Sequence, residues 1–295
     1  MVKVSVPATT ANLGPGFDTL GCALGLYATA EFAEMPSGLV IEGCDERYCG
    51  EDNLMVVAYD RVMEKLGLKR QGLKISFHSE IPISRGLGSS AALIVLGCMA
   101  ANALHGNLLS KAELLVIANA LEGHPDNVAP ALFGGLTASF LEGDEPLSVS
   151  YALSEKVHFC VLIPDFETST HEARKVLPKV VPFEDAVYNC SRCVVLAKAL
   201  ENWNEPVIRA ALNDRLHQPY RKQLIDEYES VRTICLNAGA SAFFISGSGP
   251  TCIALSEDAQ FSLRIEAAMK ELRHTWRVLD VCADRQGAES EVVSC

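Results

Sequence analysis

The chain has 295 residues, of which 49% are hydrophobic and 21% charged, and its formal net charge is −12. This composition excludes a disordered chain and favours two packed domains, while the acidic balance argues against an extended nucleic-acid surface, which needs clustered Lys and Arg. Without an apolar run of roughly 18 residues or the long apolar core of a secretory signal, we expect a cytoplasmic protein that binds neither nucleic acid nor membrane.

The first half of the chain alternates short strands with helices. Residues 2–6 show the alternation of a strand. Asp52 can cap a helix that ends before Gly67, and Ser110 with Glu113 forms a capping box for a later helix. The expected elements of this half are strands at 2–6, 28–33 and 38–43, a helix at 52–66, a strand at 73–78, a helix at 89–105, a helix after 110, a short helix ending at 134, and a strand at 136–141.

A polar, turn-rich segment, Glu142–Pro146, marks a candidate domain boundary, and we expect domains at 1–150 and 151–295. The expected elements beyond it are a strand at 157–163, helices at 170–177, 183–201, 206–213 and 221–237, strands at 241–246 and 251–256, a helix at 258–272 and a strand at 275–281. Without the additional helices this order is β-α-β-β-α-β, the split ferredoxin-like pattern. The residues from about Gln286 are expected to fray as a tail.

The 11 cysteines are scattered along the chain. In a reducing compartment they are expected to be free thiols that behave as small hydrophobic residues. Cys190 and Cys193 form a C-x-x-C pair, a spacing found in redox and metal sites, but they fall within the expected helix 183–201, and no second pair of matching spacing accompanies them. This context favours two ordinary helix residues over a metal site.

A glycine-rich loop after the expected strand 73–78 is the most informative stretch. Two glycines let the backbone approach a ligand closely. The first N–H groups of the following helix have no intrahelical partner, so together with the helix dipole they suit a phosphate. A capped helix after a simple turn is the alternative, and the lysine of the Walker A pattern is absent. The loop reads Pro82-Ile83-Ser84-Arg85-Gly86-Leu87-Gly88-Ser89-Ser90-Ala91-Ala92.

This loop resembles the second signature of the galactokinase–homoserine kinase–mevalonate kinase (GHMP kinase) superfamily, through its pattern Pro-x-x-x-Gly-Leu-Gly-Ser-Ser-Ala-Ala. The resemblance implies that the loop wraps the phosphates of ATP and that Ser90 helps to hold Mg²⁺. It also implies an α+β fold with an amino-terminal domain like domain 2 of ribosomal protein S5 and a carboxy-terminal ferredoxin-like domain. The implied ATP-binding residues are Asn53 and Leu54, near the adenine, with Pro82, Ile83, Ser84, Arg85, Gly86, Leu87, Gly88, Ser89, Ser90, Ala91 and Ala92.

A second motif follows the first expected strand and reads Pro-Ala-Thr-Thr-Ala-Asn-Leu-Gly-Pro-Gly-Phe-Asp over residues 7–18. Its Pro and Gly content indicates an ordered, irregular loop. By itself it reads as a plain connection in which Asn12 and Asp18 are turn residues. It closely resembles, however, the first signature of homoserine kinases. That resemblance implies that Asn12 and Asp18 contact homoserine, with Asp18 suited to its ammonium or hydroxyl group.

A third motif, residues 122–135, places two carboxylates and an amide close together at a helix end. Hard oxygen ligands of this kind suit Mg²⁺, although a helix end followed by a new cap at Asp126 explains them equally. The block also resembles homoserine kinases. That resemblance implies that Glu122 is the Mg²⁺ ligand and that Asp126 and Asn127 lie on the substrate side. We interpret His124 as structural.

Two segments of the second half carry candidate arginines. Residues 168–178 begin an expected helix with a Ser/Thr-rich entry that suits an anion, although Arg174 reads equally as a solvated helix residue. The segment matches the homoserine kinase pattern T-x-x-A-R-x-x-L-P, which implies that Arg174 grips the substrate carboxylate and that Thr170 faces the reacting region. Residues 217–221 resemble a second such segment and imply Arg221 as the other carboxylate ligand, because two guanidinium forks match one carboxylate.

The turn at 246–251 resembles the third superfamily signature, whose glycine loop supports the phosphate loop. Together the resemblances imply an enzyme that uses ATP and Mg²⁺ to phosphorylate the small molecule L-homoserine. The implied catalytic residues are Asp18, Thr170 and Arg174, no general base is assigned, and a homodimer is the family expectation. The alternatives are a kinase of the same superfamily for another hydroxylated metabolite and a non-catalytic small-molecule-binding regulator of the same fold.

Overall fold

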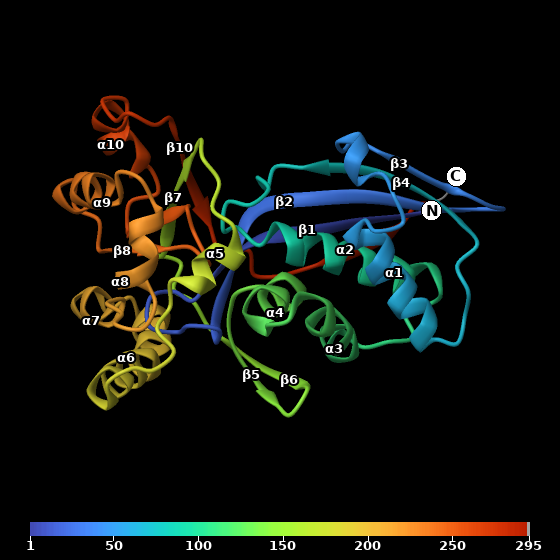
Figure 1. The fold of residues 1–295 in the computed structure, drawn as a ribbon, viewed down its shortest axis with the longest axis horizontal. Helices are drawn as coiled ribbons and strands as arrows, with labels where there is room; N and C mark the ends of the chain where they lie inside the picture. The colour runs from blue at the N-terminus through green and yellow to red at the C-terminus, as the bar shows by residue number, and fades with distance from the viewer. Residues whose placement is uncertain (294–295) are drawn as a thin grey trace.

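The computed structural model describes residues 1–293. In it, the first half of the chain forms a seven-stranded sheet together with the last strand, β11. The spatial order is β11-β1-β2-β4-β3, and the hairpin β5–β6 pairs with β2. The strands are β1 (Val2–Ala11), β2 (Leu20–Met35), β3 (Leu39–Glu42), β4 (Gly72–Ser79), β5 (Leu136–Glu142), β6 (Glu145–Tyr151) and β11 (Glu289–Val292). Against one face of the sheet lie α1 (Leu54–Lys65), α2 (Ser89–Leu104), α3 (Lys111–Glu122) and α4 (Pro125–Phe133), and the 3₁₀ helix η1 (Glu46–Tyr48) precedes α1 (Figure 1).

The helix α2 is apolar on nearly all sides because it packs between the sheet and its neighbouring helices. A Cβ on Gly97 would lie 2.1 Å from the carbonyl oxygen of Met55, so only glycine permits this close approach of α2 to α1. The capping box of Ser110 and Glu113 at the start of α3 is confirmed. This packing holds the first turn of α2 firmly beside the glycine-rich loop.

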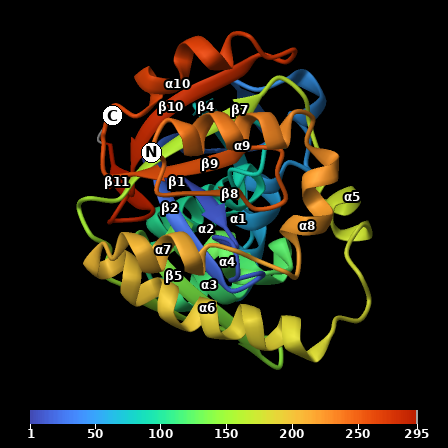
Figure 2. The same cartoon turned by 90° about the vertical axis from the view of Figure 1, so that its left-hand side faces the viewer.

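The second half forms a four-stranded antiparallel sheet in the order β10-β7-β9-β8. Its strands are β7 (His158–Pro164), β8 (Ala242–Ile245), β9 (Cys252–Ser256) and β10 (Trp276–Cys282). Its helices are α5 (Thr170–Lys175), α6 (Phe183–Asn202), α7 (Glu205–Ala211), α8 (Gln218–Arg221), η2 (Lys222–Leu224), α9 (Tyr228–Asn237) and α10 (Ser262–Met269). Figure 2 faces this half, with α9 and α10 packed across the sheet and α6 beside α7. The order confirms the predicted α+β class and ferredoxin-like pattern.

The polar segment Glu142–Pro146 belongs to the first sheet. It forms the turn of the hairpin β5–β6, in which Glu142 pairs with Glu145, so the expectation that these residues mark the boundary is wrong. Hairpin turns and linkers share the same turn-forming residues, and composition alone does not separate them. The second sheet begins with β7, and the division between residues 150 and 151 stays a prediction.

The last strand of the chain returns to the first sheet. β11 runs antiparallel to β1, from Val2 opposite Val292 to Ser5 opposite Glu289, so the expectation of a frayed tail from about Gln286 is wrong. A short polar strand is stabilised here by the free backbone edge of β1, which the local sequence does not reveal. The first residues and the last described residues therefore lie at the same end of the molecule (Figure 1).

Two helix boundaries differ from those expected. The N-cap of α1 is Asn53, whose side chain accepts a hydrogen bond from the first turn, and not Asp52. The expected helix 221–237 is interrupted. Arg221 instead ends α8, η2 follows it, and α9 begins only after Glu227, which adopts a φ of 62° while its carboxylate accepts hydrogen bonds from the backbone after α10. The break leaves Arg221 at the end of a one-turn helix.

Two remaining sequence expectations concern cysteines and membrane spans. Cys190 and Cys193 both lie on α6, and the ten cysteines within residues 1–293 are free thiols. Among the helices of the described chain, none has both the length and the apolar character needed to cross a lipid bilayer.

Candidate active site

The glycine-rich loop connects β4 to α2 and leaves the start of α2 open. Gly88 is the N-cap, at a φ of 68°, and no side chain caps the helix. The first intrahelical hydrogen bond runs from the N–H of Ala92 to the carbonyl of Gly88, so the N–H groups of the three residues between them are not used within the helix. Together with the helix dipole, these groups form a site suited to an anion.

Both glycines of the loop are required by close contacts. A Cβ on Gly88 would lie 2.0 Å from Oγ1 of Thr9, and a Cβ on Gly86 would lie 2.4 Å from the carbonyl oxygen of Ser246. The Ser246 hydroxyl also donates to the carbonyl of Gly86 at 2.6 Å. The loop is therefore held between β1 and the turn at 246–251, so this turn supports the glycine-rich loop.

An apolar cavity of about 710 Å³ opens on one side of the loop. Tyr48, Phe77 and Leu93 also lie in its wall and were not predicted, because these residues carry no motif. The mostly apolar lining suits a mostly apolar group. The predicted ATP-binding residues in this wall are Asn53, Leu54, Pro82, Ile83, Ser84, Ser89, Ser90 and Ala92.

Three side chains of the loop point elsewhere. Leu87 and Ala91 are fully buried in the core. The guanidinium of Arg85 donates to the carbonyl of Pro164 at 3.1 Å and forms an ion pair with Glu167 at 3.0 Å. The side chains of these three predicted ATP-binding residues therefore anchor the loop to the rest of the protein. The structure does not bring them into either cavity.

A polar cavity of about 320 Å³ lies on the other side of the loop. Ser84, Ser89 and Ser90 line both cavities, so the loop separates them. Segments that are distant in the chain thus meet around one space. All the residues that we predicted for the substrate and the metal line the polar cavity, namely Asn12, Asp18, Ser90, Glu122, Asp126, Asn127, Thr170, Arg174 and Arg221.

The hydroxyl of Ser90 donates a hydrogen bond of 2.6 Å to Oε2 of Glu122 at the edge of this cavity. Burial raises the pKa of Glu122, and the hydrogen bond from Ser90 and the charge of His124 oppose the rise. Within the described chain, no lysine or arginine forms an ion pair with Glu122. A hydroxyl and a buried carboxylate without a basic partner fit a hard divalent cation, which would supply the missing positive charge.

The two predicted arginines differ in their partners. Arg174 forms a bidentate ion pair with Asp18, with N–O distances of 3.0 and 2.9 Å. Arg221 is 2% exposed and donates only to the carbonyls of Ala173 and Gly247 among the described residues. Burial, and then the charge of Arg174, lower the pKa of Arg221 to about 10. A buried guanidinium without a carboxylate is costly, so this point of the cavity favours an anion.

The ring of Phe17 supports both arginines. The guanidinium carbons of Arg174 and Arg221 lie 5.7 and 5.0 Å from its centroid, within the range of a cation–π contact. Phe17 was not among the predicted site residues, although its place directly before Asp18 in the first motif was a usable signal. The ring therefore contacts two positive charges at once. In solvent the same two charges would be free to move apart.

The two asparagines predicted for the substrate already have hydrogen-bond partners. Asn12 donates to the carbonyl of Gly247 at 2.9 Å and accepts from the N–H of Asp18 at 2.9 Å. Asn127 accepts from the hydroxyl of Thr9 at 2.8 Å. Both side chains therefore hold the cavity walls together, and the amide nitrogen of Asn127 lies 3.5 Å from Oδ1 of Asp126.

His124 lines the polar cavity, although we interpreted it as structural. Its Nδ1 lies 2.6 Å from Oδ1 of Asp126. Burial disfavours the charged form of His124, but the hydrogen bond and charge of Asp126, together with the charges of Glu122 and Asp18, outweigh burial and raise the pKa of His124. Its spacing of two residues from each of Glu122 and Asp126 was the signal that could have placed it in the site.

Stability is expected to decrease below about pH 6.5 partly because His217 is buried without charge. Its Nε2 donates to the carbonyl of Gly14 at 2.7 Å. Burial lowers the pKa of His217, Asp214 and Asp18 oppose that change, and Arg221 adds to it. His217 therefore binds a proton more readily in the unfolded chain than in the folded chain. The stability that neutral His217 contributes is lost as the pH falls from its unfolded pKa toward its lower folded pKa.

The matched variant is His217→Gln, which keeps an N–H donor for Gly14 but does not titrate. Its melting temperature is expected to fall less than that of the wild type between about pH 7.5 and about pH 5.5. Differential scanning calorimetry at both pH values measures this difference. Equal losses in the two proteins would show that His217 does not contribute.

Two family models match the chain. The model described as GHMP kinases N terminal domain matches residues 53–135, and the model described as GHMP kinases C terminal matches residues 196–273. Homoserine kinases of the Kyoto and Okra strains of Clostridium botulinum are each 43% identical to the chain over 289 residues, with 97% of both chains covered.

Solved structures agree with these sequence matches. A homoserine kinase from Cytophaga hutchinsonii has a TM-score of 0.88 at 31% identity, covering 98% of this chain and 97% of that one. Mevalonate kinase of L. major, solved with R-mevalonate, has a TM-score of 0.76 at 17% identity, covering 97% and 96%, and shows the fold alone. Because relatives of this similarity span nearly the whole chain, the protein belongs to the homoserine kinases of the GHMP kinase family.

Proposed function

We propose that the protein transfers the γ-phosphoryl group of ATP to the side-chain hydroxyl of L-homoserine, with ADP and O-phosphohomoserine as products. Family membership makes it a kinase that uses ATP and supports homoserine as the acceptor, a step of threonine biosynthesis. The observation that carries the proposal is the phosphate-type loop between an apolar cavity and a polar one. Phosphoryl transfer requires mainly positioning and charge neutralisation, and this arrangement supplies both.

ATP fits the loop and the apolar cavity together. The adenine would occupy the apolar cavity near Asn53 and Leu54, and the phosphates would meet the open N–H groups at the start of α2. Ser84, Ser89 and Ser90 reach both cavities, so the terminal phosphate would enter the polar cavity from the loop side.

Homoserine fits the polar cavity as a zwitterion. Its carboxylate would bind Arg221, which has no carboxylate partner among the described residues, and Arg174. Its ammonium group would bind Asp18. Because Arg174 and Asp18 are paired with each other, a zwitterion offers each of them a replacement partner and leaves neither charge uncompensated. This matching explains an amino-acid substrate better than a sugar or a mevalonate.

Mg²⁺ would be held by Ser90 and Glu122, whose side chains meet at 2.6 Å. Bound there, the ion would neutralise charge on the phosphates during transfer. Burial raises the pKa of Glu122, and a cation beside it would lower that pKa and favour the ionised form. Asp126 and Asn127 would lie on the homoserine side of the ion.

The polar cavity offers positioning groups and no lysine within the described chain. Lys3 is an exposed residue of β1 and lines neither cavity. We therefore assign no general base, and the γ-phosphate itself would accept the proton of the homoserine hydroxyl. Asp18 and Arg174 would act by orienting the substrate, and Thr170, whose hydroxyl lies 3.3 Å from that of Ser248, would face the reacting region.

Arg174→Ala is expected to raise KM for homoserine by about 10- to 100-fold and to change KM for ATP by less than about threefold. The substitution removes one of the two guanidinium groups for the carboxylate and leaves Asp18 without its partner, whereas the phosphate loop is untouched. A coupled assay of ADP release, with each substrate varied in turn, measures both constants.

The matched control is Arg264→Ala on α10, whose ion pair with Asp258 at 2.6 Å is similarly exposed but lies outside both cavities. It is expected to leave both KM values unchanged. Equal loss of affinity for both substrates in the Arg174 variant would count against its assignment to homoserine. The same assay across homoserine, threonine, serine, mevalonate and galactose tests the acceptor, and absence of turnover with homoserine would overturn the proposed function.

A further inference from the structure

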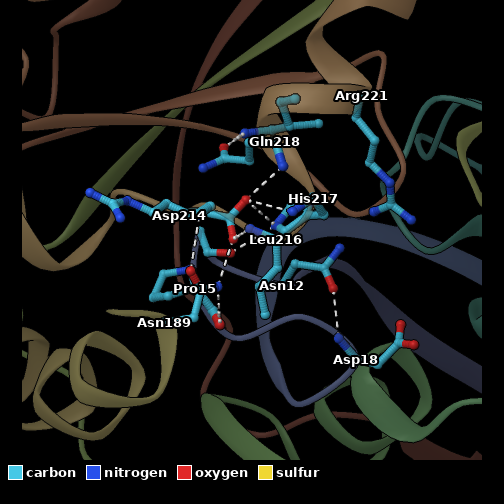
Figure 3. A network of polar contacts seen from close by, with 12 residues as sticks. Asn12, Pro15, Asp18, Asn189, Asp214, Leu216, His217, Gln218 and Arg221 are labelled. Atoms are coloured by element: carbon cyan, nitrogen blue, oxygen red, sulfur yellow. Dashed lines mark hydrogen bonds and ion pairs between the residues drawn. The ribbon is translucent and has the colours of Figure 1, made fainter. Parts of the chain in front are cut away.

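Asp214, between α7 and α8, is a buried carboxylate that serves no role assigned above. Its side chain is fully buried, yet within the described chain it has no lysine or arginine partner, and its nearest basic atom is Nε2 of the neutral His217 at 3.6 Å. Four hydrogen bonds compensate its charge (Figure 3). They come from the backbone N–H groups of Leu216, His217 and Gln218 and from the side chain of Asn189, at 2.8, 2.9, 2.6 and 2.6 Å.

Three of these bonds shape the turn that carries Arg221. They satisfy consecutive N–H groups at the start of α8, which no intrahelical carbonyl can satisfy. A helix of four residues has little stability by itself, so its geometry depends on such external bonds. Gln218 adds one, since its side-chain oxygen accepts the N–H of Ile245 at 2.8 Å. Arg221 follows three residues later and reaches the polar cavity.

The same cluster reaches the loop of the first motif. Asn189, bonded to Asp214, also donates to the carbonyl of Pro15 at 3.2 Å, and His217 donates to the carbonyl of Gly14 at 2.7 Å. Figure 3 shows these residues between the α8 turn and the loop that carries Asn12 and Asp18. Asp214 therefore lies where the two walls of the homoserine pocket meet.

We propose that Asp214 is a positioning residue for homoserine, which holds the α8 turn with Arg221 in register with the loop of Asn12 and Asp18. The inference rests on the proposed function, because it assigns the carboxylate end of homoserine to Arg221. A positioning residue differs in this respect from an ordinary helix cap, which would stabilise the fold without changing KM for one substrate more than for the other.

The hydrogen-bond pattern requires a carboxylate and not an amide. Oδ1 of Asp214 accepts from Leu216 and Asn189, and Oδ2 accepts from His217 and Gln218. In Asp214→Asn one of these positions becomes an NH₂ group that faces two donors, whichever way the amide is turned. Two buried bonds are thereby lost at a single site, and the turn must shift.

Asp214→Asn is expected to raise KM for homoserine by about tenfold or more and to change KM for ATP by less than about twofold. Asp280→Asn is the matched control, because Asp280 also accepts the N–H and hydroxyl of a helix-starting residue, Ser262, in the second half of the chain. This control is expected to lower the melting temperature and leave both KM values unchanged.

A second readout separates positioning from general damage. In an Arg221→Lys background, Asp214→Asn is expected to add less than about threefold to KM for homoserine, because the group that Asp214 positions has already been altered. Full additivity of the two substitutions would overturn the proposal. So would a homoserine KM within about twofold of the wild type in Asp214→Asn, or an equal rise in both KM values.

If Asp214→Asn does not fold, Asn189→Ala decides the matter. This variant breaks the link to Pro15 but leaves the three backbone bonds of Asp214 in place. A rise of about threefold or more in KM for homoserine alone supports the proposal, and unchanged constants overturn it. Wild-type turnover with homoserine is measured alongside, so that failure of the proposed function is recognised separately from failure of this inference.

Discussion

Glu122→Gln is expected to reduce kcat by about 10²- to 10³-fold, because it removes the negative charge that would hold Mg²⁺ beside the phosphates. Glutamine keeps the size of the side chain, and its oxygen can still accept the 2.6 Å hydrogen bond from Ser90, so the fold is preserved. The half-saturating Mg²⁺ concentration is also expected to rise, since a neutral amide oxygen is a weaker ligand for a hard cation than a carboxylate. ADP release measured over a range of Mg²⁺ concentrations, at saturating homoserine, checks both effects.

Glu113→Gln supplies the control from the opposite end of the same helix, α3. Glu113 completes the capping box with Ser110 and lies outside both cavities, and a glutamine at this position can still complete the box. Its kcat and Mg²⁺ dependence are expected to match those of the wild type. If Glu122→Gln and the wild type depend on Mg²⁺ concentration in the same way, Glu122 does not belong to the site.

Gly88→Ala is expected to lower kcat/KM for ATP by about 10²-fold or more, since the added Cβ displaces the phosphate loop. That Cβ would lie 2.0 Å from Oγ1 of Thr9 and 3.2 Å from Oδ1 of Asn127, and these two side chains are hydrogen-bonded to each other at 2.8 Å. Relief of the contact must move either β1 or the start of α2, and each movement disturbs the N–H groups that face the phosphates. Initial rates with ATP varied at saturating homoserine measure the loss.

Gly67→Ala separates this contact from the cost of the backbone conformation. Gly67 has a φ of 71°, close to the 68° of Gly88, but a Cβ there would meet nothing within 4 Å. The left-handed conformation of the alanine therefore destabilises both variants by a similar amount, about 1–2 kcal/mol. Only Gly88→Ala is expected to lose affinity for ATP. Similar kcat/KM values for the two variants would show that the packing of Gly88 is not needed for ATP binding.

Local features of the chain were predictable because they depend on residues a few positions apart. The capping box of Ser110 and Glu113 needs only a spacing of three residues, and the phosphate loop needs two glycines before a helix start. The capping box and the glycine turn before the start of α2 are confirmed, as is the strand and helix order of the ferredoxin-like half. Turn residues were less informative, because the segment Glu142–Pro146 forms a hairpin turn where a domain boundary was expected.

The candidate site was predictable as a set of residues but not as a geometry. Resemblance to homoserine kinases singled out Asp18 and Arg174, which are 156 positions apart, and the structure shows that they pair with each other. Sequence reasoning could not foresee that pairing, since each residue reads locally as a turn residue or a solvated arginine. It also assigned Arg85 to the nucleotide, whereas the arginine binds Glu167 and the end of β7.

The amino-acid sequence by itself determined most of the elements and their order, because hydrophobic periodicity, glycine positions and helix caps act over one or two turns of chain. Only the tertiary structure decided where the helix after Arg221 breaks, that β11 returns to β1, and that Asp214 joins the two walls of the pocket. These features rest on hydrogen bonds between distant segments, such as the bond from His217 to Gly14 across 203 positions. Such bonds form only when packing has already brought buried donors and acceptors together, and the local pattern of residues carries no record of their partners.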